Sequence, residues 1–160
     1  MNPYVEIPCD NINQIRAGIL EFVINKTDVL EKPIDPNMVW HFIECKELLY
    51  AVPELLEFFK DKKLVPRHAA VTVITEDGQL PKHVDEPPVV AKINFPVINT
   101  DGWVNRWYDG DKIIAELHDM KLPVVFNSQI PHSVERTSGV EIPRIVASFT
   151  FHNEPLDMLA

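Results

Sequence analysis

The feature that most constrains this chain is a series of short, strand-like segments from Pro66 onward, several of which end at a turn signal. About eight segments fit into about 85 residues, a spacing typical of a β-barrel or a double-sheet sandwich. Proline accounts for 14 of the 160 residues, and it interrupts helices and central strands. The expected strands are residues 69–75, 81–86, 89–98, 103–108, 112–117, 122–126, 133–136 and 144–151.

The preceding part of the chain has helical rather than strand spacing. One predicted helix buries residues at i, i+4, i+7 and i+8, namely Ile15, Ile19, Phe22 and Val23. Asp10 or Asn11 is expected to cap this helix. Two further helices are predicted over residues 44–50 and 54–60, with Pro53 at a first helical turn.

The length and the order of these segments predict a single, mainly β domain. The 160 residues lie within the roughly 100–200 that are usual for one domain, and no linker interrupts residues 1–160. Since helices come first and strands later, we expect a jelly-roll core over residues 66–151. Residues 10–61 are expected to form a helical support region on its outer face.

Charge and cysteine content narrow the range of partners. The net charge of −9 repels phosphate backbones, so we expect no nucleic-acid partner, and it mildly favours neutral or basic substrates. The sequence has no run of 18 apolar residues and no leader-like N-terminus, so we expect neither a membrane span nor a signal peptide. Cys9 and Cys45 match no metal or disulfide pattern, which indicates a reducing, cytoplasmic setting.

The first chemical signal is the segment Lys82-His83-Val84-Asp85-Glu86. Residues i and i+2 of a strand share a face, so His83 and Asp85 can point at one ion. An imidazole and a carboxylate together suit Fe(II), Mn(II) or Zn(II). This spacing alone is weak evidence, because His152 and Glu154 repeat it.

A later histidine can complete the first pair. His132 follows Asp85 by 47 residues, and a jelly-roll can bring such distant strand ends together at its mouth. Two histidines and one carboxylate form a facial triad that leaves one side of the ion open. His152 has no later histidine to serve as a third ligand. The predicted metal ligands and catalytic residues are therefore His83, Asp85 and His132.

Arg144 begins an otherwise apolar segment, 12 residues after His132. A buried guanidinium requires an anionic partner, and its planar fork matches a carboxylate with two hydrogen bonds. If no protein carboxylate pairs with Arg144, a bound acid is the natural partner. Ser148 shares the Arg144 face by strand alternation and adds a hydroxyl group.

The ordered set of His83, Asp85, His132 and Arg144 resembles the Fe(II)/2-oxoglutarate-dependent oxygenase family. The matching segments are PKHVDE and VVFNSQIPHSVERTSGVEIPRIVASFTF. The resemblance implies a cupin-like jelly-roll, the double-stranded β-helix. It also implies hydroxylation of a C–H bond by O2 with oxidation of 2-oxoglutarate to succinate and CO2. The segment RIVASFTFHNEP is similar to the aspartyl/asparaginyl β-hydroxylase branch.

By this resemblance, the three triad residues hold Fe(II) and Arg144 binds the distal carboxylate of 2-oxoglutarate, the cosubstrate. Asn94 and Ser148 are the further expected cofactor-binding residues, Asn94 on condition that its strand face points inward. Lys92 shares that face and either adds charge to the site or extends to solvent. Many members have Ser or Thr two residues after the arginine, where this chain has Val146.

Several other residues have two alternative roles, one in the site and one in the structure. Trp103, Trp107 and Tyr108 either line a substrate pocket or, as is commoner for such residues, pack in the core. Arg106 and Arg136 either meet an acidic substrate group or are surface charges.

Three functions remain open from the sequence. An oxygenase acting on a small molecule or a peptide side chain is the leading hypothesis. A cupin-like metalloprotein with other chemistry is the second, and Val146 favours it. A noncatalytic binding module is the third. The sequence assigns no oligomeric state.

Overall fold

The computed structural model describes residues 1–26, 40–75, 79–137 and 139–160. The sequence also predicts a turn at residues 76–78 and a polar, proline-containing connection at residues 25–37. That turn and most of that connection lie outside the described ranges. The elements in chain order are β1 (Tyr4–Glu6), α1 (Ile12–Asn25), β2 (Trp40–Glu44), α3 (Leu48–Ala51), α4 (Pro53–Asp61), β3 (Pro66–Ile74), β4 (Leu80–His83), β5 (Ala91–Ile98), β6 (Trp103–Asp109), β7 (Lys112–His118), β8 (Val124–Asn127), β9 (His132–Arg136), β10 (Arg144–Phe151) and the 3₁₀ helix η1 (Leu156–Leu159).

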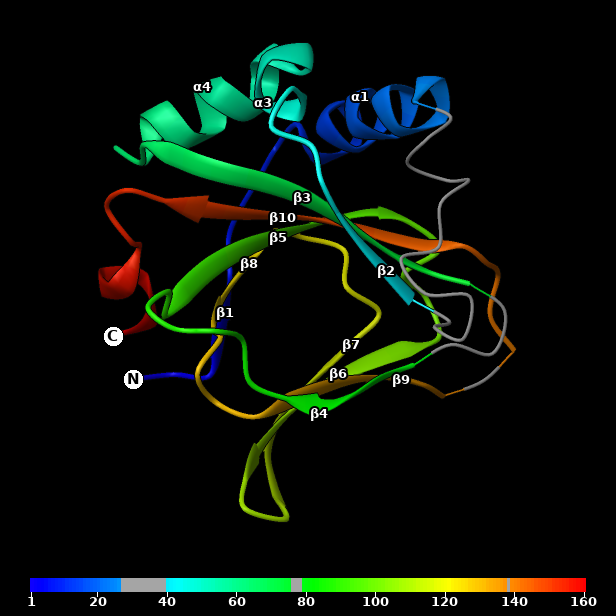
Figure 1. The fold of residues 1–160 in the computed structure, drawn as a ribbon, viewed down its shortest axis with the longest axis vertical. Helices are drawn as coiled ribbons and strands as arrows, with labels where there is room; N and C mark the ends of the chain where they lie inside the picture. Colours follow the sequence, from blue (N-terminus) through cyan, green and yellow to red (C-terminus); the bar gives the residue numbers. More distant parts are fainter. Residues whose placement is uncertain (27–39, 76–78, 138) are drawn as a thin grey trace.

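The strands form two antiparallel sheets that face each other, and α1, α3 and α4 cover the outer face of the larger sheet (Figure 1). The larger sheet has the order β1-β8-β5-β10-β3-β2, and the smaller sheet has the order β4-β9-β6-β7. This arrangement is a double-stranded β-helix, which confirms the predicted fold class. Strands that are distant in sequence become neighbours in it, so β4 pairs with β9.

The helical part follows its apolar pattern with three differences in detail. Ile15, Ile19 and Val23 are buried on one face of α1, as predicted, but Phe22 is only partly buried. Asn11 occupies the N-cap position, but its side chain makes no capping hydrogen bond. Pro53 begins α4, where its fixed φ and missing N–H suit the first turn. The helix predicted over residues 44–50 is reduced to the short α3.

The prediction that residues 10–61 are helical is wrong over β2. This segment pairs antiparallel with β3, with Phe42 opposite Thr72 and His41 opposite Val73. A five-residue segment with three apolar residues does not by itself distinguish a strand from a helix. The free edge of β3 decides the outcome here, because it offers the backbone groups of residues 40–44 a ladder of hydrogen bonds.

The main core lies between the larger sheet and the helices. Phe59 of α4 is fully buried, and edge-to-face contacts join its ring to Phe58, Phe95, Phe149 and Phe151, at centroid distances of 5.0–5.9 Å. These phenylalanines come from α4, β5 and β10, so they fix the helices to the two central strands. The inner face of the larger sheet is thereby left to line the space between the sheets.

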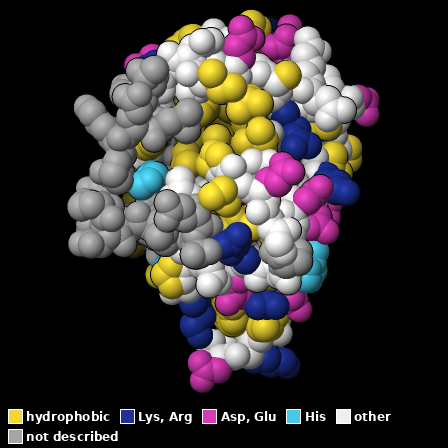
Figure 2. Space-filling model, turned by 90° about the vertical axis from the view of Figure 1, so that its right-hand side faces the viewer, with side chains coloured by type: hydrophobic (Ala, Val, Ile, Leu, Met, Phe, Trp, Pro, Cys, Tyr) yellow, Lys and Arg dark blue, Asp and Glu magenta, His cyan; other side chains and the backbone are white. Residues whose placement is uncertain are grey.

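The β6–β7 hairpin projects from the body of the molecule at the bottom of Figures 1 and 2. Its tip carries acidic, basic and hydrophobic side chains together, including the exposed Ile113 and Ile114. No helix within the described residues is long and apolar enough to cross a membrane.

Candidate metal and cosubstrate site

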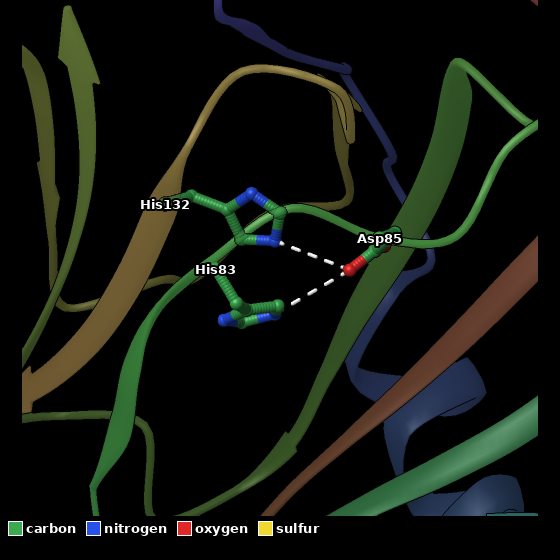
Figure 3. Close-up of side chains that lie close together, drawn as sticks. All are labelled: His83, Asp85 and His132. Atoms are coloured by element: carbon green, nitrogen blue, oxygen red, sulfur yellow. Dashed lines mark ion pairs between the residues drawn. The ribbon is translucent and has the colours of Figure 1, made fainter. Parts of the chain in front are cut away.

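Pairing of β4 with β9 places two of the predicted metal ligands side by side. His83 is the last residue of β4, and it lies opposite His132, the first residue of β9. Asp85 lies two residues beyond the end of β4, where its backbone N–H donates to the Ser128 carbonyl at 3.0 Å. This bond turns the chain so that the Asp85 carboxylate faces both imidazoles (Figure 3).

The geometry of the three side chains suits one metal ion. Asp85 Oδ1 lies 3.4 Å from His83 Nε2 and 3.5 Å from His132 Nε2, and all three ligand atoms lie within 4.8 Å of one another. Ligands bonded to one ion at about 2.1 Å and at right angles are separated by about 3 Å. A small contraction around an ion therefore converts the group into a facial triad.

Backbone carbonyls select the histidine nitrogen that faces the site. His83 Nδ1 donates to the Pro81 carbonyl at 2.7 Å, and His132 Nδ1 donates to the Ile130 carbonyl at 2.8 Å. A carbonyl only accepts, so the proton of each neutral ring resides on Nδ1. Nε2 of a neutral ring then presents its lone pair, which is the orientation that metal-binding histidines require. A ring that carries a second proton instead donates it from Nε2 to Asp85.

Asp85 is ionised despite its partial burial. Burial by itself would raise the pKa of Asp85, but hydrogen bonds from His132 and His83 and the nearby Lys92 ammonium outweigh it and hold the pKa far below the usual range. Lys92 Nζ lies 2.8 Å from Asp85 Oδ2. The pKa of His83 is raised, because its hydrogen bond to Asp85 favours the protonated ring more than burial opposes it.

A cavity of about 490 Å³ extends from the triad between the two sheets. Larger-sheet residues Lys92, Asn94, Arg144, Val146 and Ser148 lie on its wall, so the Asn94 face of β5 does point inward. The other lining residues are Phe42, Thr72, Leu80, His83, Asp85, Glu86, Asn105, Trp107, Met120, Val124, Phe126, His132, Ser133 and Val134. The cavity thus combines the triad with all three predicted cofactor-binding residues.

Arg144 is the only buried arginine or lysine among the residues that line the cavity. It is 2% exposed, and its Nε has no hydrogen-bond partner within the part of the chain that the structure describes. The guanidinium carbon lies 5.6 Å from the centre of the Trp103 ring. Burial lowers the pKa of Arg144 to about 10, which still leaves it charged at neutral pH. A buried, unpaired guanidinium is costly unless an anion joins it.

The structure decides between the two alternatives for Lys92 and adds Thr72, which the sequence did not indicate. Lys92 adds its charge to the site and does not extend to solvent, because its side chain is only 16% exposed and is paired with Asp85. Thr72 of β3 lies opposite Val146 in the register and lines the cavity, so it places a hydroxyl where the sequence seemed to lack one. Both features depend on a residue outside the same strand, Asp85 for Lys92 and Val146 for Thr72. Periodicity along one strand does not reveal such partners.

Most of the other sequence candidates lie outside the cavity, and Trp107 is the exception. Arg106 pairs with Glu116 and Glu135 on the outer face of the smaller sheet. Tyr108 shares a hydrogen bond with Ser133 at 2.9 Å and does not line the cavity. Trp103 is buried in the core, whereas Trp107 is part of the cavity wall.

The second histidine–acid pair has a structural role. Glu154 Oε1 accepts backbone N–H bonds from Val90 at 2.6 Å and from Ala91 at 2.9 Å. His152 is exposed, and within the described residues it belongs to no cluster of potential metal ligands.

Comparison with known proteins places the fold. The sequence matches no protein-family model and no curated protein. Solved structures are similar to it, although their sequence identity is low. A prolyl hydroxylase from Trichoplax adhaerens, in complex with a hypoxia-inducible-factor peptide fragment, is 8% identical with a TM-score of 0.61, over 94% of this chain and 84% of that one.

Two further structures agree with this result. A prolyl-4-hydroxylase from Pseudomonas putida is 16% identical with a TM-score of 0.56, over 94% of this chain and 92% of that one. The α-ketoglutarate-dependent epimerase SnoN from nogalamycin biosynthesis is 12% identical with a TM-score of 0.60, over 95% of this chain and 78% of that one. The similarities give no support to the aspartyl/asparaginyl hydroxylase branch. The chain has the double-stranded β-helix fold of the Fe(II)/2-oxoglutarate oxygenases, and it carries a His-X-Asp…His triad within that fold.

Proposed function

We propose that this protein is an Fe(II)- and 2-oxoglutarate-dependent oxygenase that hydroxylates a C–H bond. The observation that carries the proposal is Arg144, a buried cation without an acidic partner among the described residues, in the same cavity as a His83, Asp85 and His132 triad. The triad provides for a metal with an open side, and Arg144 provides for the carboxylate of an acid bound beside that metal.

The side chains of the cavity fit both Fe(II) and 2-oxoglutarate. Two imidazole nitrogens and one carboxylate oxygen suit Fe(II), and the guanidinium fork suits a carboxylate. Thr72, opposite Val146, adds a hydroxyl group to the cavity wall at the position of the departure from the family pattern, and Ser148 adds another further along β10. When bound, iron and 2-oxoglutarate supply the activation of O2. The protein holds their ligands in place and surrounds them with a largely apolar wall.

An anaerobic titration tests the proposal. Fe(II) is added to the metal-free protein, then 2-oxoglutarate, and the visible charge-transfer band of the iron-bound keto acid is recorded. We expect the band in the native protein. Arg144→Met should weaken 2-oxoglutarate binding by about 10- to 150-fold, as expected for the loss of a charge-assisted pair, with little change in iron affinity.

Arg136→Gln is a matched control. Arg136 also lies against the Trp103 ring, at 5.7 Å, but it does not line the cavity, so this variant should retain the band. Iron binding without a band in the native protein would contradict the proposal. So would an Arg144→Met variant that binds 2-oxoglutarate as well as the native protein does.

Val146 supports a second candidate, a cupin-like metalloprotein whose open metal site performs other chemistry. The apolar side chain occupies a position that offers no hydroxyl to a cosubstrate carboxylate. Metal binding without 2-oxoglutarate binding in the same titration would favour this candidate. Absence of any divalent metal binding would favour a noncatalytic module.

A small molecule or a peptide side chain remains the proposed substrate, and a cytoplasmic setting remains a prediction. Both cysteines are free thiols, Cys9 half-buried and Cys45 buried. Burial, the main cause, raises the pKa of the Cys45 thiol to about 11, which keeps it protonated and unreactive at neutral pH.

A further inference from the structure

The net charge of the side chains that line the cavity differs from the net charge of the whole molecule. The chain carries −9 overall, and acidic and basic side chains are interspersed on the face shown in Figure 2. Exposed charges more than about 8 Å from a ligand are largely screened at physiological salt. The groups on the cavity wall therefore decide which ligand charge the cavity accepts.

The charged side chains of the cavity wall, counted together with the metal and 2-oxoglutarate of the proposed function, leave a net positive charge in the cavity. Lys92 and Asp85 form an ion pair and cancel, while Arg144 contributes one positive charge. Glu86 also lines the cavity, but it is exposed and hence screened by water. A divalent metal raises the total to three positive charges, and 2-oxoglutarate removes two. One positive charge remains inside a mostly apolar wall.

The smaller sheet contributes N–H donors without acceptors. Asn105 and Trp107 of β6 line the cavity and are 8% and 3% exposed. Asn105 Nδ2 and Trp107 Nε1 are both buried without a hydrogen-bond partner among the described residues. A buried donor left unpaired costs about 1–3 kcal/mol, so a ligand with acceptor oxygens is favoured beside them.

The position of these donors separates them from Arg144. Arg144, on the larger sheet, lies beside the ring of Trp103, the first residue of β6 on the smaller sheet. Asn105 and Trp107 follow Trp103 along β6 by two and four residues. At about 3.3 Å per residue, these steps are about 7 and 13 Å. Trp107 pairs in register with His132, so it lies on the smaller sheet at the metal end of the cavity.

We propose that the substrate to be oxidised is a small carboxylic acid with an apolar remainder, and that Asn105 and Trp107 bind its carboxylate. This inference rests on the proposed function, which supplies the metal and the cosubstrate. The surplus positive charge favours the carboxylate, and the two N–H groups fix its position. Met120, Val124 and Phe126 of the cavity wall contact the apolar remainder.

The test uses protein loaded with redox-inert Zn(II) and 2-oxoglutarate, so that binding is measured without turnover. The probes are acids and their primary amides in matched pairs: butanoate, hexanoate, octanoate, phenylacetate and 3-phenylpropanoate. Saturation-transfer NMR titrations give their affinities. We expect at least one acid to bind tenfold or more tightly than its amide. Asn105→Leu and Trp107→Phe should each reduce that preference by about fivefold or more, with unchanged 2-oxoglutarate affinity.

Trp103→Phe is the matched control, because Trp103 Nε1 is also buried and unpaired among the described residues but Trp103 does not line the cavity. This variant should keep the acid preference, and circular dichroism checks the fold of each variant. A panel in which no acid binds better than its amide, whether both bind or neither does, overturns the inference.

Two further results have distinct meanings. If Asn105→Leu and Trp107→Phe weaken 2-oxoglutarate instead, the donors serve the cosubstrate, and the inference fails while the oxygenase proposal survives. If the iron-dependent band of the preceding titration is absent, the oxygenase proposal fails and this inference fails with it.

Discussion

Asp85 gives each of its carboxylate oxygens a different partner. Oδ1 faces the two imidazoles at 3.4 and 3.5 Å, and Oδ2 lies 2.8 Å from the Lys92 ammonium. The side chain is only 18% exposed, so little water competes for either oxygen. Lys92 thereby holds the carboxylate with one oxygen directed at the position between the histidines, before any metal binds.

Asp85→Asn should destabilise the metal-free protein at neutral pH by about 1–3 kcal/mol, because Lys92 then loses its ionised partner. The pKa of Asp85 is lowered on folding. The stabilisation is therefore complete above the ordinary carboxyl pKa of about 4 and declines as the pH falls below it toward the lowered value. Urea unfolding of both proteins at several pH values measures this difference.

Asp111→Asn is the control for that experiment. Asp111 also pairs with a lysine, Lys82, at 3.5 Å, but its side chain is fully exposed. It should unfold at the same urea concentration as the native protein. An Asp85→Asn variant as stable as the native protein at pH 7 would show that the Lys92 pair contributes nothing to the fold.

The elements differ in how they serve the site. α4 touches no metal ligand, yet its Phe59 joins the helices to β5 and β10 through ring contacts with Phe95, Phe149 and Phe151. β10 begins with Arg144, and β5 carries Lys92 and Asn94. The phenylalanine cluster therefore supports from behind the sheet whose other face forms the cavity wall.

Phe59→Ala should lower the free energy of unfolding by about 3–5 kcal/mol, because it leaves a cavity in a closely packed aromatic cluster. Urea denaturation followed by circular dichroism measures the change. Tyr50→Ala is the control: Tyr50 lies on α3 and is 73% exposed, so its loss should change the midpoint little. Equal midpoints for the two variants would mean that the helices add no stability to the sheet.

At the scale of the whole molecule, the site joins the two sheets. His83 and His132 belong to the smaller sheet, while Lys92 and Arg144 belong to the larger one. Ligands that contact both sheets bind the folded chain and not the unfolded one, so they should raise the melting temperature.

Mn(II) with 2-oxoglutarate, each at about 100 times its dissociation constant, should stabilise the fold by about 2.7 kcal/mol or more. For a domain of this size that is roughly 5–10 °C in melting temperature. His132→Ala should abolish the shift, and EDTA should reverse it. His118→Ala is the control: it removes an exposed histidine of β7, and this variant should keep the full shift in melting temperature. A shift that persists in His132→Ala would place the metal elsewhere.

Much of the fold could be predicted from the sequence because strand and turn signals are local. The last strand begins and ends where the pattern predicts, at Arg144 and Phe151, and the ligand spacing His83-X-Asp85 is visible in the chain. The same signals could not identify β2, because a five-residue segment with three apolar residues becomes a strand only when β3 offers an edge.

The sequence by itself determined eight of the ten strands and their order, the jelly-roll class and the residue types from which a metal site can be built, but it missed β1 and β2. Only the tertiary structure decided that Arg144 is buried without an acid partner in the described chain, that Lys92 pairs with Asp85, and that Thr72 lies opposite Val146. The physical reason is that periodicity reports which face of its own strand a side chain occupies. Its partner, its burial and its charge balance are set by strands that lie far away in the sequence.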